Sequence, residues 1–504
     1  MVTVTLHTPD GVQSVQVVTG TRLADIQTEQ GQSIVRPCGG VGRCGQCRVR
    51  AVGSLSPITE KECNHFTEEE RADGIRLACC TFVTGDAQIW WEEETSLTHI
   101  MTDSHCDVEV VRPLFTRLGA AIDIGTTTIA ARLYDESGRL ATAAAPNSQS
   151  RYGADVISRI SYALGGGAEA LSACVRADVN GLLGRLCRQV GRKTEELDGL
   201  VVTGNTAMLY LLTGESVAPL AAAPFAITEV YGRLVSPAGW GWDVREDLPV
   251  YLPRCMTAFV GADITTAQLA SGLCDSTGPA LLADIGTNGE LTLWQGGTLS
   301  VCSTAAGPAF EAANLSCGKQ GVNGAVDRVW IEGNTLGIHT IDEGTPVGIC
   351  GSGVTDLVAC LLHTGRLDET GYLEEGAVTL APGVFFTQED VRQVQLAKSA
   401  IRSGLEILLH TAGVAHEQVK RFAVAGGFGS YMSPDSAAAI GLIPPSLRNL
   451  CESIGNAALT GAAMMLCDRG QIKKGDELAK KARHVELATD GYFSEQYIEQ
   501  MMFG

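Results

Sequence analysis

The sequence predicts a small α+β domain followed by a larger α/β domain made of two related lobes. Residues 1–95 contain alternating apolar and polar stretches around a glycine-rich loop, "CGGVGRCGQC", that carries three cysteines. The tetrapeptide "DIGT" occurs twice, at 123–126 and at 284–287, each time between two apolar runs. A length of 504 residues is enough for about two to four domains.

Charge and composition exclude several classes of function. The net charge of −20 and the pI near 4.9 argue against a broad nucleic-acid-binding surface, which requires a basic stripe. No apolar run reaches the length of about 18 residues that a membrane span requires, and the first residues alternate like a strand rather than a signal peptide. We therefore expect a cytoplasmic protein without a membrane segment, in which the ten scattered cysteines after residue 106 are small buried hydrophobes.

The N-terminal elements follow in the order expected of a β-grasp domain. Residues 2–6 and 13–18 alternate at period two around the turn sequence "TPDG", which predicts a hairpin. Residues 21–31, "TRLADIQTEQG", predict a helix that ends at Gly31. A late strand is predicted at 85–91.

The cysteine loop predicts an iron–sulfur centre. Cys38, Cys44 and Cys47 have the spacing C-x5-C-x2-C, and further cysteines follow in "RLACC". This is one residue longer than the plant-type 2Fe–2S spacing, whereas zinc sites, the alternative, usually pair two short hooks. The glycines allow the backbone to curl so that its N–H groups point at negatively charged sulfurs.

With that loop, residues 1–95 resemble the 2Fe–2S ferredoxin family. The resemblance implies that Cys79, which closes "RLAC", is the fourth ligand beside Cys38, Cys44 and Cys47. Cys80 is the alternative, although it would point elsewhere in an extended chain.

Residues 96–117 are predicted to be a linker. They mix polar and apolar side chains without periodicity and include Pro113. His99, His105 and Cys106 lack a nearby fourth partner for a metal site, so we expect them to be solvated.

The remaining chain is predicted to form two lobes, 118–275 and 276–504, each opening on a strand, a DIGT turn and a second strand. In such a turn, glycine lets the backbone approach a phosphate, and N–H groups and threonine hydroxyls can donate to its oxygens. An aspartate at the end of the first strand is placed to hold Mg²⁺, usually through water. No Walker A sequence is present.

Two further glycine-rich turns follow. Residues 421–432, "RFAVAGGFGSYM", predict a strand that runs into a helix, and residues 347–362 open another helix from "GICGSG". Together with the DIGT turns, these segments resemble the acetate and sugar kinase, heat-shock chaperone and actin superfamily over about residues 118–470. The resemblance implies a two-lobed actin/sugar-kinase-like ATPase that binds ATP and Mg²⁺ between its lobes.

The same resemblance implies the residues of the ATP site. The first phosphate loop would be Asp123, Gly125, Thr126 and Thr127; the second Asp284, Gly286, Thr287 and Asn288; and the adenosine motif Gly426 and Gly427. We expect Asp123, Asp284 and Glu311 to be the catalytic carboxylates, with Asp263 and Glu290 as further candidates for orienting the attacking water.

The whole chain resembles the reductive activators of corrinoid-dependent methyltransferases, in which a 2Fe–2S domain precedes such an ATPase. The segments "GADVISRISYA", "TGNTAM", "FVGADI" and "STAAGPAFE" carry this likeness. It implies an ATP-dependent enzyme that takes one electron from an external donor and reduces a corrinoid (cobalamin-type) protein from Co(II) to Co(I). It also implies a homodimer.

Electron transfer to a low-potential acceptor explains why an electron carrier is joined to an ATPase. A plant-type cluster has a potential near roughly −400 mV, and each 59 mV changes a one-electron equilibrium about tenfold. The alternatives are a low-potential donor to another radical or metalloenzyme, a small-metabolite kinase with a redox sensor, and a redox-responsive chaperone-like scaffold. Nucleotide-dependent cobalt reduction separates the first prediction from all three.

Overall fold

A computed structural model describes residues 1–8, 11–26, 34, 42, 47–90, 108–333 and 335–504. The chain divides into two compact units, one comprising residues 1–98 with 148–167 and the other residues 99–147 with 168–504. No helix in these described ranges is both long and apolar enough to cross a membrane.

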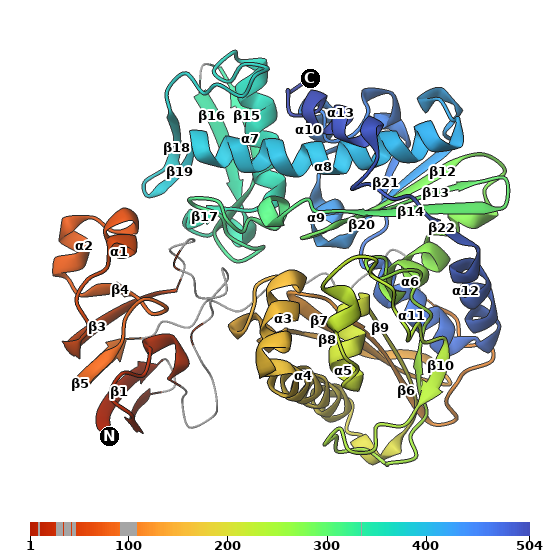
Figure 1. Ribbon diagram of the computed structural model, residues 1–504, viewed down its shortest axis with the longest axis horizontal. Coiled ribbons are helices and arrows are strands. Elements are labelled where there is room, and N and C mark those ends of the chain that lie inside the picture. Colours follow the sequence, from red (N-terminus) through yellow and green to blue (C-terminus); the bar gives the residue numbers. More distant parts are fainter. Residues whose placement is uncertain (9–10, 27–33, 35–41, 43–46, 91–107, 334) are drawn as a thin grey trace. The chain divides into compact units, whose positions relative to one another are not determined.

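A five-stranded sheet forms the centre of the first unit (Figure 1). Its strand order is β2-β1-β5-β3-β4, with β1 and β2 forming the predicted hairpin and β1 parallel to β5. The late strand predicted at 85–91 is confirmed as the end of β5. The elements of this unit are β1 Val2–Thr8, β2 Gly11–Val17, β3 Arg48–Leu55, β4 Ile75–Leu77, β5 Val83–Trp90, α1 Glu60–His65, α2 Glu68–Ala72 and α3 Val156–Tyr162.

The helix predicted over 21–31 is wrong in its described part. Only Leu23–Asp25 is helical, as a single 3-10 turn, and Ile26 that follows has extended backbone angles. Leu23 and Ile26 are still both buried in the domain core, as their apolar character requires. Spacing of apolar residues at i and i+3 was therefore a correct signal of burial but not of an α-helix.

A buried ion pair braces β4, the strand that leads to the predicted fourth ligand. Glu62 is fully buried at the first turn of α1 and accepts hydrogen bonds from Arg76 Nε (2.8 Å), Leu77 N (3.1 Å) and the Thr81 hydroxyl (3.0 Å). Burial alone would raise the pKa of Glu62, but the hydrogen bonds from Arg76, Thr59 and Leu77 lower it to about 2. Ionised Glu62 is thus part of the native fold.

We expect the first unit to lose stability in acid because of Glu62. Its pKa is lower in the folded chain than its ordinary value of 4.5, so its contribution is present above pH 4.5 and is lost as the pH falls towards 2. The contribution is on the order of 3 kcal/mol. Hydrogen exchange of residues 75–83 should show lower protection in Glu62→Gln than in wild type at pH 6, and a smaller change between pH 6 and pH 3.

The control for that experiment is Glu70→Gln. Glu70 also lies in the third position of a capping box and also pairs with an arginine, Arg48, but the pair is exposed. Exposed pairs contribute little, so Glu70→Gln should behave as wild type. Equal protection in both variants would contradict the assignment to Glu62.

The second unit contains two six-stranded sheets that share an arrangement of five strands and differ in the sixth, which is β10 beside β11 in the first sheet and β22 beside β14 in the second. In the first sheet β8, β7 and β6 are antiparallel, and β9 and β11 continue parallel to β6. In the second sheet β14, β13 and β12 are antiparallel, and β20 and β21 continue parallel to β12. The prediction of two related lobes is confirmed. The strands are β6 Leu118–Ile124, β7 Thr128–Asp135, β8 Gly138–Pro146, β9 Leu197–Gly204, β10 Arg233–Val235, β11 Val250–Leu252, β12 Ala280–Ile285, β13 Gly289–Gln295, β14 Thr298–Thr304, β20 Arg421–Ala425, β21 Cys451–Ser453 and β22 Ala482–His484.

The helices of this unit pack on those sheets, and one helix from the C-terminal part of the chain packs on the first sheet (Figure 1). Although it lies near the C-terminus, α11 packs against β6, β9 and α6 of the first sheet. Smaller sheets and the remaining helices complete the two lobes. The elements are α4 Ala168–Gln189, α5 Thr206–Thr213, α6 Ala262–Ser271, β15 Ala325–Glu332, β16 Thr335–Thr340, β17 Gly348–Ile349, α7 Gly351–His363, β18 Ala377–Ala381, β19 Val384–Thr387, α8 Gln388–Ala412, α9 Gly426–Tyr431, α10 Pro434–Ala439, α11 Ala457–Cys467, α12 Arg469–Lys481 and α13 Gly491–Glu499.

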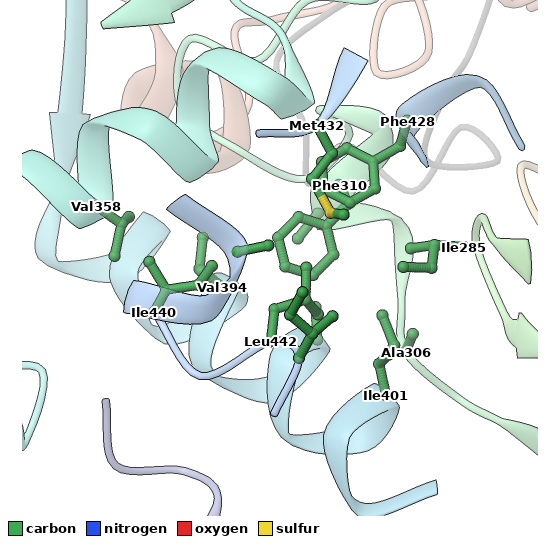
Figure 2. Packing of buried hydrophobic residues seen from close by; sticks show 14 of the residues in the cluster. Ile285, Ala306, Phe310, Val358, Val394, Ile401, Phe428, Met432, Ile440 and Leu442 are labelled. Carbon is green, nitrogen blue, oxygen red and sulfur yellow. The ribbon is translucent and has the colours of Figure 1, made fainter. Parts of the chain in front are cut away.

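A hydrophobic core lies directly behind the second DIGT turn (Figure 2). Phe310 and Phe428 stack there with ring centroids 4.8 Å apart, and Ile285 belongs to the same cluster. These three residues are the sequence neighbours of Glu311, Gly427 and Asp284, respectively. Packing of the core therefore fixes the backbone that carries the candidate site residues.

Candidate functional site

Two of the four predicted cluster ligands lie in the described residues, and the fold brings them together. Cys47 precedes β3 and Cys79 follows β4, and both are buried. The Cys79 backbone N–H donates to Cys47 Sγ over 3.4 Å, and Ala78 N donates to the Cys47 carbonyl over 2.8 Å. Cys38 and Cys44 lie outside the described residues.

This arrangement fits an iron–sulfur centre. An N–H group that donates to sulfur stabilises a thiolate, which is the form that binds iron. Cys38, Cys44 and Cys47 would supply three ligands from one loop, and Cys79 would supply the fourth from the turn after β4.

The expectation that Cys80 points elsewhere is wrong. It assumed an extended chain, whereas residues 78–80 form a turn closed by a hydrogen bond from Cys80 N to the Leu77 carbonyl (2.9 Å). In a turn, neighbouring side chains need not lie on opposite faces, and the sulfurs of Cys79 and Cys80 are only 3.7 Å apart.

In the second unit, five carboxylates gather from both lobes. Asp123 is the penultimate residue of β6, Asp263 lies in the first turn of α6, and Asp284 is the penultimate residue of β12. Glu290 and Glu311 complete the group, which we call the carboxylate cluster. All five keep some accessible surface, as residues that meet a ligand must.

Burial, and then the charges of neighbouring carboxylates, raise the pKa values of four of these groups. Burial raises the pKa of Asp123 to about 7 and that of Asp284 to about 6, with further increases from the charges of Asp284 and Glu311, respectively. Burial raises the pKa of Asp263 to about 8, and the charges of Asp123 and Asp284 add to it. Burial also raises the pKa of Glu290 well above its ordinary value. Such a concentration of negative charge is suited to a cation.

The carboxylate cluster does not form a direct metal cage. Within the described parts of the chain, no three His, Cys, Asp or Glu side chains converge closely enough to bind one ion together.

Each DIGT turn is closed by a hydrogen bond from its glycine N–H, to a carbonyl three residues on in the first turn and two residues on in the second. Gly125 N donates to the Thr128 carbonyl over 2.9 Å, and Gly286 N donates to the Asn288 carbonyl over 3.0 Å. The Thr287 hydroxyl donates to Glu311 over 2.5 Å, which places that carboxylate against the second turn. The predicted residues Thr126, Thr127 and Asn288 are half-buried in these turns.

The predicted adenosine motif meets the second turn at one point. Gly426 begins α9 with φ +88°, and a Cβ on it would lie 2.8 Å from Asp284 Oδ1. Gly427 is exposed, and a Cβ there would meet nothing within 4 Å. Packing therefore requires a glycine at position 426 but not at position 427.

Three asparagines that sequence reasoning missed hold the first DIGT turn. Asn456 Nδ2 donates to Asp123 Oδ2 over 3.1 Å, Asn147 Nδ2 to the Gly125 carbonyl over 2.9 Å, and Asn205 Nδ2 to the Thr126 hydroxyl over 3.3 Å. Asn205 and Asn456 also cap the N-termini of α5 and α11. An asparagine directly before an apolar helix was the available signal.

The fold and these sites define a ferredoxin domain joined to an ATP-binding domain of the acetate and sugar kinase, heat-shock chaperone and actin (ASKHA) type. Residues 7–84 match the family model of the 2Fe-2S iron-sulfur cluster binding domain. Residues 118–276 match the RACo middle region, and residues 278–504 match the C-terminal ASKHA domain of RACo.

Known proteins with the same organisation include corrinoid activators. The corrinoid activation enzyme RamQ of Eubacterium limosum is 30% identical over 83% of this chain and 76% of its own. The Co(II) methylated amine-specific corrinoid protein reductase of Methanosarcina barkeri is 24% identical over 76% of this chain and 77% of its own. The solved structure of a reductive activator for a corrinoid, iron-sulfur protein is 25% identical with a TM-score of 0.71, covering 100% of this chain and 98% of that one. The chain belongs to the family of reductive activators of corrinoid proteins.

We expect Gly426→Ala to weaken ATP binding. The new methyl group would collide with Asp284 Oδ1, so either the α9 turn or the carboxylate must shift. A loss of about tenfold in affinity corresponds to about 1.4 kcal/mol. Calorimetric titration with Mg-ATP measures it.

Gly383→Ala is the matched control. Gly383 also has a positive φ, +76°, but its added Cβ meets nothing within 4 Å. Both variants carry the backbone strain of a left-handed alanine, so equal ATP affinities in the two would contradict a specific contact at Gly426.

Proposed function

We propose that this protein is an ATP-dependent reductive activator that returns a corrinoid protein from Co(II) to the active Co(I) state. The observation that carries the proposal is the presence, in one chain of this family, of a Cys47–Cys79 ligand pair and a carboxylate cluster between two DIGT turns. One site is suited to single electrons and the other to a nucleotide. A function that used only one of these two sites would leave the other site without a role.

Cys38, Cys44, Cys47 and Cys79 are the proposed ligands of a 2Fe–2S cluster. When bound, the cluster supplies transfer of one electron at a time. The chain's own contribution is the hydrogen bond from the Cys79 N–H to the Cys47 sulfur and the exclusion of water around both sulfurs, which are buried.

The two DIGT turns are proposed to hold the phosphates of ATP. Gly125, Thr126 and Thr127 would donate from the first lobe, and Gly286, Thr287 and Asn288 from the second. Gly426 and Gly427 would lie against the adenosine. The position of one glycine turn in each lobe, after β6 and after β12, supports this, because backbone N–H groups of such turns can bind a polyphosphate from opposite sides.

Asp123 and Asp284 are the proposed holders of Mg²⁺, through water. Asn456 fixes the orientation of Asp123 by its hydrogen bond. Glu311 is the proposed group that orients the attacking water, because Thr287 holds one of its oxygens and burial raises its pKa, which favours acceptance of a proton.

The partners are proposed to be a corrinoid (cobalamin-type) protein and an external low-potential electron donor. The homodimer and the cytoplasmic location implied by the sequence stay predictions. Light scattering of the purified protein would test the homodimer.

Absorption spectroscopy tests the proposal directly. The anaerobic protein is mixed with reductant, Mg-ATP and each of several Co(II) corrinoid proteins from methyltransferase systems. At least one mixture should develop the Co(I) spectrum. A protein that contains iron and binds ATP but reduces none of these partners would favour another low-potential acceptor instead.

Substitution of Asn456 separates its contact with Asp123 from its role as a helix cap. Asn456→Asp keeps an oxygen for the Leu459 N–H but places a negative charge beside Asp123, whereas Asn456→Ser keeps a capping oxygen without that charge. We expect a greater loss of ATP hydrolysis in Asn456→Asp than in Asn456→Ser. Both should unfold within about 1 kcal/mol of wild type. The reverse order of activity would contradict the contact.

A further inference from the structure

Cys80 lies beside the predicted fourth ligand in a way that the cluster does not require. Its sulfur is 3.7 Å from Cys79 Sγ, and both residues belong to the turn 78–80. For a tetrahedral thiolate site with metal–sulfur bonds of about 2.3 Å, two sulfurs on one metal are about 3.7 Å apart. The Cys80 sulfur therefore lies within one ligand spacing of the Cys79 sulfur.

A second contact places Cys80 against the cysteine loop. Gly42, buried in the middle of the loop between Cys38 and Cys44, has φ +74°, and a Cβ built on it would lie 2.7 Å from Cys80 Sγ. The absence of a side chain at this position leaves the space that the Cys80 sulfur fills. Among the described residues, the Cys80 sulfur thus lies against Gly42.

The turn itself is anchored independently of either sulfur. Ala78 N and Cys79 N both donate to Cys47, and Glu62 braces the adjoining Leu77 N–H. Loss of the Cys79 side chain would leave these three backbone hydrogen bonds intact, so Cys80 would stay near the cluster site.

We propose that Cys80 is a reserve ligand, which takes the fourth coordination position when Cys79 cannot. The inference rests on the proposed cluster. Cys79 is 4% exposed whereas Cys80 is only half-buried, so ligation through Cys80 would bring the centre nearer to solvent. Solvent exposure changes the potential of such clusters, and a better solvated reduced form raises it.

The test uses the full chain, purified without oxygen, as Cys79→Ala, Cys80→Ala and the double variant. Iron content, the electron paramagnetic resonance spectrum of the reduced protein and its midpoint potential are measured. Cys80→Ala should match wild type, Cys79→Ala should keep most of its iron with an altered spectrum and a higher potential, and the double variant should lose its iron. Cys63→Ala, an exposed cysteine in the same domain, is the matched control.

Cys79→Ser provides a second variant if the alanine protein unfolds. A sulfur-ligated spectrum that is lost in Cys79→Ser/Cys80→Ala would show ligation by Cys80, as expected, whereas an oxygen-ligated spectrum that is the same in both of these variants would overturn the inference. Cys79→Ala with as little iron as the double variant would also overturn it. Iron-free wild type would instead overturn the proposed function.

Discussion

The Cys47→Ala variant is expected to lose cobalt reduction while keeping ATP binding. Cys47 lies at the centre of the ligand arrangement, because it accepts hydrogen bonds from both Ala78 and Cys79 and is 2% exposed. The reserve role proposed for Cys80 concerns the position of Cys79 and leaves that of Cys47 unfilled, so the iron content should fall to background. The rate of Co(I) formation should then fall to that of the reductant alone.

Cys63→Ala is the appropriate control for this prediction. It removes a cysteine from the same domain at an exposed position in α1 and should leave iron, potential and cobalt reduction unchanged. Mg-ATP affinity, measured by calorimetry, should be the same in both variants and in wild type. Cobalt reduction at the wild-type rate by iron-free Cys47→Ala would remove the cluster from the pathway.

The Asp284→Asn variant is expected to show the complementary defect. Asp284 contacts the Gly426 turn and lies among Asp263, Glu290 and Glu311. Loss of its charge removes a proposed Mg²⁺ holder from the phosphate side, and loss of a preorganised charge of this kind lowers turnover about 100- to 1000-fold. Steady-state ATP hydrolysis and cobalt reduction should both fall, with iron content unchanged.

Asp247→Asn tests whether a changed charge alone has this effect. The Asp247 side chain is 79% exposed and pairs only with Arg245 in the same surface turn. This variant should hydrolyse ATP at the wild-type rate. A similar loss in Asp247→Asn and Asp284→Asn would mean that the carboxylate cluster is not the nucleotide site.

Local pattern was sufficient for the strands and turns that carry the site. Both DIGT hairpins and the strand before Gly426 were predicted because a buried strand that ends in a glycine turn has a distinctive apolar run and break. The duplicated tetrapeptide also predicted the duplicated topology. These signals are all contained within short segments.

Features that depend on distant parts of the chain could not be predicted in this way. The hydrogen bond from Asn456 to Asp123 joins residues 333 positions apart, and α11, which carries it, gives no sign in its apolar sequence that it packs on the first sheet. The turn at Cys79 and Cys80 was mistaken for extended chain because backbone anchoring by Cys47 is a tertiary contact. Short apolar spacing at Leu23 similarly could not distinguish a 3-10 turn from an α-helix.

The most direct test of coupled ATP use and electron transfer is a single-turnover experiment. The protein is reduced in advance, freed of excess reductant and mixed anaerobically with a Co(II) corrinoid protein that it activates, while Co(I) absorbance is followed. We expect Co(I) to form with Mg-ATP and to stay at background without nucleotide or in Asp284→Asn. Equal formation of Co(I) with and without Mg-ATP would contradict the account.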